Sequence, residues 1–197
     1  MLLLTKNSNL FKSVILSTLL LPAFIQADNR QNLFASVSAG YNSLNGDEVT
    51  SINLDSSGYN YTIELGYEIS ADTEITLNYQ KIVNDNLSLD NYYIASNYKF
   101  LNVTSLTPYL GVTLGYSELT WDKNPINTNK IDSLSSSYIG GINIGTIYKI
   151  NSSISLTMSY QLQYMNNHET SIKTSTLTGK LTHDMLNSFN IGVRYFF

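Results

Sequence analysis

The stretch that decides the fold is YNYTIELGYEI, residues 59–69, in which apolar and polar side chains alternate without a break. Successive side chains of a β-strand point to opposite faces, so strict alternation indicates a strand with one apolar and one polar face. No helical period occurs beyond residue 30. The alternation is found in eight runs, at residues 33–41, 59–69, 75–80, 92–100, 109–116, 138–148, 154–164 and 189–197. The sequence therefore predicts an all-β protein with eight strands.

The composition of the polar face predicts which face turns inward. A soluble sandwich or lipocalin-like barrel buries its apolar face, whereas a membrane barrel turns that face outward. A water-facing sheet would be rich in Lys, Glu and Arg, but this polar face is mostly Ser, Thr, Asn, Gln and Gly. Such residues can fill the narrow interior of an eight-stranded barrel. Only 13% of the chain is charged, about half of the roughly 25% found in ordinary soluble domains. The sequence therefore favours a transmembrane barrel.

Charges on the polar face are few and mixed in sign. They are Glu64, Glu68, Glu74, Lys99 and Arg194. Because a buried charge needs a partner, Glu64, Glu68, Lys99 and Arg194 are predicted to form an ion network in the lumen. We expect this network to be a structural plug, with a gate as the alternative. Five bulky side chains share the inward parity: Tyr93, Tyr109, Ile139, Ile147 and Phe196.

Connections between the predicted strands differ in length. Three are long, at Asn42–Gly58, Ser117–Ser136 and Met165–Asn187, and the other four, Asn84–Asp90 among them, span seven residues or fewer. Outer-membrane barrels combine short periplasmic turns with longer extracellular loops. The pattern predicts an antiparallel up-and-down barrel with both chain ends on the periplasmic side. Tyr and Phe at the two ends of the apolar face predict two aromatic girdles.

The first 27 residues have the pattern of a secretory signal peptide. Lys6 and Lys12 form a basic region, an apolar stretch covers 13–25, and Ala27 precedes the expected cleavage site. The mature chain is then 28–197, one barrel domain. Loss of the two lysines takes the net charge from −4 to −6.

Three motifs give the chain its resemblance to a known family. They are YLGVTLGY at 109–116, GINIG at 141–145 and the ending GVRYFF at 192–197. Over residues 33–197 the chain resembles the small outer-membrane β-barrels of the OmpA/OmpX type, in their barrel domain only. The resemblance implies a bacterial outer-membrane location, contact with outer-membrane lipid and lipopolysaccharide, and delivery by the barrel assembly machinery. The assembly signal that it implies consists of Phe189, Ile191, Val193, Tyr195 and Phe197.

The expected function is structural or a surface interaction of the adhesin kind, carried by the extracellular loops. Trp121 is the candidate recognition residue in these loops, because Trp is enriched at binding hot spots. Two alternatives remain open. A lipid A-modifying enzyme would need His168 or His183 beside a Ser near the rim, such as Ser188, and a narrow channel would need a continuous lumen.

Other classes of function have little support in the sequence. The chain has no Cys, which removes disulfide scaffolds, thiol catalysis and Cys-based metal sites. A pI of about 5.0 gives no basic surface for nucleic acid. We therefore expect no catalytic residues, no cofactor and no bound metal.

Overall fold

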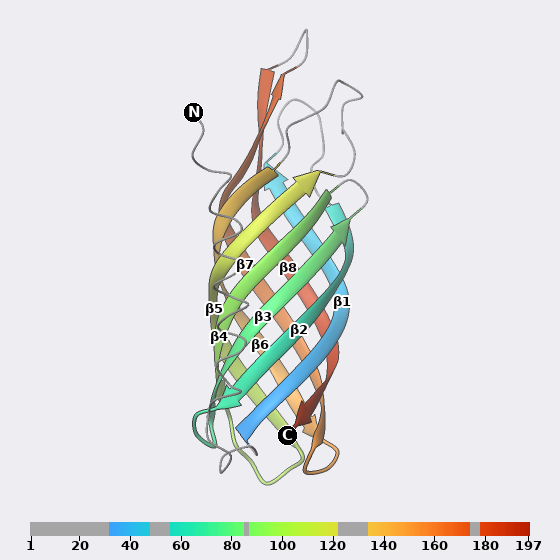
Figure 1. Ribbon diagram of the computed structural model, residues 1–197, viewed down its shortest axis with the longest axis vertical. Coiled ribbons are helices and arrows are strands. Elements are labelled where there is room, and N and C mark those ends of the chain that lie inside the picture. The colour runs from blue at the N-terminus through green and yellow to red at the C-terminus, as the bar shows by residue number, and fades with distance from the viewer. Residues whose placement is uncertain (1–31, 48–55, 85–86, 122–133, 174–177) are drawn as a thin grey trace.

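The eight predicted strands form one closed barrel. The computed structural model describes residues 32–47, 56–84, 87–121, 134–173 and 178–197; the predicted signal peptide lies outside them. The strands are β1 (Leu33–Asp47), β2 (Ser56–Glu68), β3 (Thr73–Asn84), β4 (Leu87–Lys99), β5 (Leu106–Trp121), β6 (Leu134–Lys149), β7 (Ile154–Lys173) and β8 (Thr178–Phe196). Each strand pairs antiparallel with its neighbour in the chain, and β8 closes on β1 (Figure 1). The predicted fold class is confirmed. No helix within the described residues is long and apolar enough to cross a membrane.

The apolar face of the barrel points outward, as the polar residues predicted. Ile63, Val112 and Ile144 are 55%, 61% and 58% exposed. The side chains at the alternate, inward-pointing positions are buried instead, and Thr76 and Asn97 are almost completely covered. An apolar surface of this extent around a whole barrel is suited to lipid and not to water. The five bulky side chains predicted to point inward are buried or half-buried.

Aromatic side chains mark two levels on the outer surface. Tyr79, Tyr92, Tyr116 and Tyr138 lie opposite one another on four consecutive strands. On β6 the outer ring is Tyr138 and the inner one is Tyr148, ten residues further along the strand. At about 3.3 Å per residue and a tilt of about 40°, ten residues rise roughly 25 Å, which matches the apolar band of a membrane barrel.

The strands extend beyond the predicted boundaries at the outer end of the barrel. The loops predicted at Asn42–Gly58, Ser117–Ser136 and Met165–Asn187 are too long, because only 48–55, 122–133 and 174–177 separate the strands. The connection predicted at Asn84–Asp90 shortens to 85–86 in the same way. β7 and β8 continue as a hairpin that projects beyond the barrel (Figure 1).

An apolar cluster inside the outer end of the barrel explains this difference. We call it the outer cap, and none of its members is more than 2% exposed: Leu44, Ile82, Leu87, Leu89, Leu119, Ile139, Met165 and Leu186. In five strands a cap residue lies three residues outward from a girdle aromatic, as Leu119 does from Tyr116. An odd spacing places the two side chains on opposite faces. Beyond the girdle the apolar residues therefore point inward. This is the reverse of the prediction, which assigned the apolar residues of each strand to the outward face.

Candidate functional site

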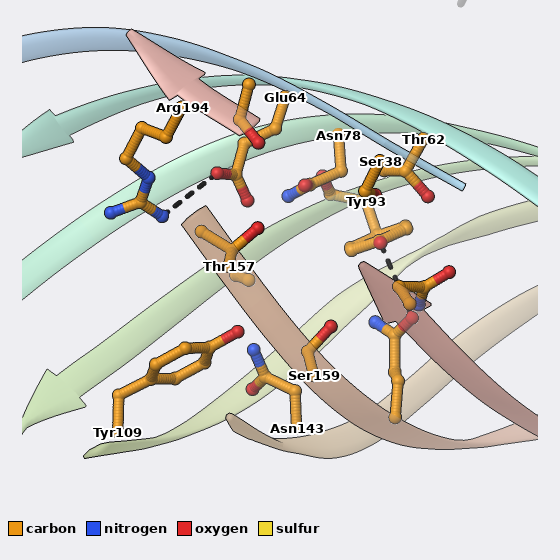
Figure 2. A pocket seen from close by; sticks show the side chains of 14 residues that line it. Ser38, Thr62, Glu64, Asn78, Tyr93, Tyr109, Asn143, Thr157, Ser159 and Arg194 are labelled. Carbon is orange, nitrogen blue, oxygen red and sulfur yellow. Dashed lines mark hydrogen bonds and ion pairs between the residues drawn. The ribbon is translucent and has the colours of Figure 1, made fainter. Parts of the chain in front are cut away.

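The interior of the barrel is centred on a buried arginine. Arg194 projects inward from β8 and is 2% exposed. Its Nη2 donates a hydrogen bond to Glu64 Oε1 of β2 at 3.0 Å (Figure 2). Its two terminal nitrogens also donate to the two oxygens of Glu74, at 2.8 Å and 3.0 Å. This bidentate contact fixes the plane of the guanidinium group and gives the buried charge its partners.

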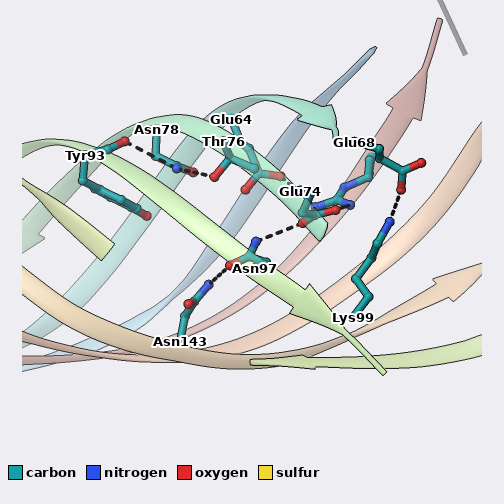
Figure 3. A network of polar contacts seen from close by, with 10 residues as sticks. Glu64, Glu68, Glu74, Thr76, Asn78, Tyr93, Asn97, Lys99 and Asn143 are labelled. Atoms are coloured by element: carbon teal, nitrogen blue, oxygen red, sulfur yellow. Dashed lines mark hydrogen bonds and ion pairs between the residues drawn. The ribbon is translucent and has the colours of Figure 1, made fainter. Parts of the chain in front are cut away.

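Glu74 begins a chain of amide hydrogen bonds across the lumen (Figure 3). Asn97 Nδ2 donates to Glu74 Oε1 at 2.9 Å, and Asn143 Nδ2 donates to Asn97 Oδ1 at 2.8 Å. A carboxylate only accepts hydrogen bonds, so Glu74 determines the orientation of both amides. Glu74 is absent from the network that the sequence predicts. Its position directly opposite Glu68 on the inward face is the signal that could have included it.

The second ion pair of the lumen joins Lys99 on β4 to Glu68 on β2 (Figure 3). The four residues of the predicted network thus form two pairs, Arg194 with Glu64 and Lys99 with Glu68. Both pairs lie toward the periplasmic end of the barrel, where β2 and β4 end.

Two aromatic rings cover the arginine at this end. The Arg194 Cζ atom lies 3.7 Å from the centroid of the Phe34 ring, and the Phe34 and Phe196 centroids are 5.3 Å apart. The cation–π contact stabilises the buried charge further. Gly66 makes room for Phe34, since a Cβ at residue 66 would overlap the Phe34 ring.

A polar cavity of about 50 Å³ lies in the lumen beside the Arg194–Glu64 ion pair (Figure 2). Glu64, Arg194 and Tyr109 line it, together with the amide side chains of Asn143 and Asn190. Within the described ranges no group of three or more His, Asp or Glu side chains is placed to hold a metal ion.

Residues considered for catalysis and recognition lie at the outer end. Trp121, expected in a loop, is the last residue of β5 and pairs through its backbone with Leu87; its side chain lies outside the described part. His168 and His183 were also expected outside the strands, and this was wrong, because they occupy paired backbone positions on β7 and β8. Ser188, expected at the strand start, is buried in β8, five residues or about 16 Å along the strand from His183. The structure therefore does not bring this Ser and His together.

The five residues of the implied assembly signal lie on one face of β8 and the chain end. All of them are exposed on the lipid side: Phe189, Ile191, Val193, Tyr195 and Phe197. Tyr195 and Phe197 form an edge-to-face pair with centroids 5.4 Å apart. This face meets lipid along its whole length.

Three solved structures share this architecture. Neisserial surface protein A has a TM-score of 0.66 and 19% identity over 84% of this chain and 97% of that one. OprG from Pseudomonas aeruginosa has a TM-score of 0.54 and 11% identity over 84% of this chain and 97% of that one. OprH from the same organism has a TM-score of 0.52 and 17% identity over 84% of this chain and 99% of that one. The chain has the fold of the small outer-membrane β-barrels. No protein-family model matches its sequence, and no curated protein does.

This fold agrees with the surface of the molecule. Outer-membrane barrels have an outward apolar band with aromatic girdles at both ends. The band between Tyr138 and Tyr148 has that form. The predicted resemblance is confirmed at the level of the fold, and the barrel is one that lies in a bacterial outer membrane.

Proposed function

We propose that this barrel is a non-conducting outer-membrane protein that contacts surface ligands through its outer end, as an adhesin does. The observation that carries the proposal is the filled interior combined with the projecting β7–β8 hairpin. The hairpin extends outward from the outer cap, whose members come from most of the strands. A rigid base lowers the entropy that is lost when a projecting segment binds a partner.

A channel is the first alternative, and the outer cap argues against it. The cap fills the lumen with aliphatic side chains on the outer side of the polar cavity. An ion crossing this layer would lose its hydration without gaining a polar partner. An eight-stranded barrel also leaves space for little more than its own side chains.

A lipid A-modifying enzyme is the second alternative. It would need a nucleophile and a base within hydrogen-bond reach near the rim. The distance of about 16 Å between Ser188 and His183 along β8 does not support that pair. We therefore propose that the protein is not an enzyme.

The route to the membrane belongs to the same proposal. Residues 1–27 would direct export and be removed, leaving 28–197 as the mature barrel. The lipid-facing side of β8, from Phe189 to Phe197, would be read by the barrel assembly machinery. In the membrane the outer girdle would contact lipopolysaccharide.

The test compares the wild type with a variant in which residues 169–182 are replaced by Asn-Gly, a favoured two-residue hairpin turn. Both are displayed on a Gram-negative host and applied to arrays of glycans and matrix proteins, and both are reconstituted in planar bilayers. Heat-modifiable gel migration verifies that the variant barrel is folded. We expect ligand binding that the variant loses and no stable conductance from either protein. Stable single-channel conductance of the wild type without array binding would refute the proposal.

A further inference from the structure

The turn between β4 and β5 exposes apolar side chains at the periplasmic end of the barrel, which is the lower end in Figure 1. Leu101 is 58% exposed, Val103 is completely exposed, and residues 100–105 carry no charge. The other two turns at this end are more polar, with Asp72 in the β2–β3 turn and Ser152 in the β6–β7 turn. Single exposed aliphatic side chains are common on protein surfaces. An uncharged turn that presents several of them indicates a contact surface.

The polar side chains of this turn bind its own backbone. Asn102 Nδ2 donates a hydrogen bond to Leu106 O at 2.8 Å, and the Thr104 backbone N–H donates to Asn102 Oδ1 at 2.9 Å. The Leu106 N–H donates to Thr104 Oγ1 at 3.3 Å. These bonds supply partners that water would otherwise provide, so they lower the cost of moving the turn out of water. The apolar side chains then form its outer surface.

The apolar surface of the turn continues the lipid-facing band of the barrel. Tyr98 and Phe100 at the end of β4 are each 51% exposed, and their rings form an edge-to-face pair with centroids 5.4 Å apart. Leu101 follows Phe100 directly. On the other side of the turn, Leu106 is 46% exposed and pairs with the inner girdle residue Tyr148. The surface therefore runs from the girdle into the turn without an intervening charge.

We infer that the β4–β5 turn lies in the periplasmic leaflet of the membrane, where Leu101 and Val103 contact phospholipid at the boundary between headgroups and acyl chains. Val103 is three residues from Leu106, so it lies at most about 11 Å beyond the inner girdle. The headgroup layer is about 5–8 Å thick on each side of a bilayer. A small tilt of the barrel toward β4 and β5 is therefore enough to bring Val103 to the acyl chains.

A spin label at the tip of each periplasmic turn tests this contact. The chain has no Cys, so Val103→Cys, Ala71→Cys and Ser152→Cys each give one labelled site in the full mature barrel. Ala71 and Ser152 are exposed in the β2–β3 and β6–β7 turns and serve as matched controls. The barrels are reconstituted in vesicles of phosphatidylethanolamine and phosphatidylglycerol. We expect oxygen, which concentrates in lipid, to relax the label at residue 103 more than the water-soluble Ni-EDDA does, and the reverse at both controls.

A second experiment tests whether the apolar side chains cause the contact. The label is placed at Ser105→Cys, in a chain that is otherwise unchanged and in one that also has Leu101→Asn and Val103→Asn. The label should move from a lipid to a water environment when both replacements are present, and heat-modifiable migration verifies folding. Water exposure of residue 103 equal to that of both controls would overturn the inference. So would lipid exposure of all three tips, or a label at residue 105 that stays in lipid after the replacements.

Discussion

Replacing Ile144 by Arg tests whether the exposed apolar face lies in lipid. Ile144 is 58% exposed on β6, between Leu110 of β5 and Tyr160 of β7. It lies six residues from the outer girdle residue Tyr138 and four from the inner one, Tyr148. At about 2.5 Å of height per residue, this places it within roughly 3 Å of the middle of the apolar band.

The expected cost follows from that depth. Arg at the midplane of a barrel destabilises it by about 2–4 kcal/mol, and near the interface by at most about 1 kcal/mol. The matched control is Ser136→Arg, on the same strand and the same outward face. Ser136 is exposed, lies beyond the outer girdle and pairs with Glu118, which would attract the new cation. We expect the Ile144 variant to lose about 2–4 kcal/mol of unfolding free energy and the control less than about 1 kcal/mol.

The assay is urea unfolding of the barrel in lipid vesicles, followed by the fluorescence of Trp121, the single Trp of the chain. Far-ultraviolet circular dichroism provides a second probe of the same transition. Equal effects of the two substitutions would show that residue 144 does not lie in hydrocarbon. A tolerated Arg at residue 144 would restore the soluble-barrel interpretation.

Three further outcomes are expected. Gly66→Ala displaces the Phe34 ring and should cost about 1–3 kcal/mol in the same assay, whereas Gly140→Ala, whose Cβ would find its nearest neighbour at 3.8 Å, should change little. In the turn after β2, the hydrogen bond from the Ser70 hydroxyl holds the pKa of Asp72 below its ordinary 3.8. The hydrogen bond stabilises the turn above pH 3.8, and this stabilisation is lost as the pH falls through the lowered pKa. Ser70→Ala should therefore raise the pKa of Asp72 in an NMR titration. Trypsin added to intact cells should spare Lys149, exposed at the periplasmic end of β6, and cut there only in opened membranes.

Period-two alternation was enough to predict the membrane-embedded part of the barrel. The run at 59–69 has lipid on its apolar face and the lumen on its polar face. An apolar residue in this run therefore indicates the lipid side, and a polar residue indicates the lumen side. The same reasoning placed Tyr93 and Tyr109 inside, against their apolar character, because parity and not hydropathy decided.

The ends of the strands could not be predicted by the same rule. Between Tyr116 and Leu119 the chain leaves the apolar band, and the environments on the two sides exchange. Outside there is headgroup or water, and inside there is a packed apolar cluster. A rule that equates apolar with outward therefore interprets Ser117–Trp121 as a loop, although the strand continues.

The pairing of charged residues within the lumen could be identified only from the three-dimensional structure. Parity assigns Glu64, Glu74 and Arg194 to the interior, but strand tilt and register decide which of them meet. Arg194 reaches Glu74 across the lumen, although the two residues belong to strands that are not neighbours in the barrel. Sequence spacing contains no information about such a contact.

The outer cap places a second kind of stabilising force at the exposed end of the barrel. In the membrane band, packing an outward Ile or Val against protein gains little hydrophobic free energy, because lipid is as apolar as the side chain. Leu119 is different: three residues beyond Tyr116, it lies about 8 Å outside the girdle, at the level of headgroups and water. Burying such a side chain contributes about 1.5–3 kcal/mol, as in a soluble core. Packing of this kind holds the strands together where no bilayer supports them, and it explains how β7 and β8 can continue outward from a fixed base.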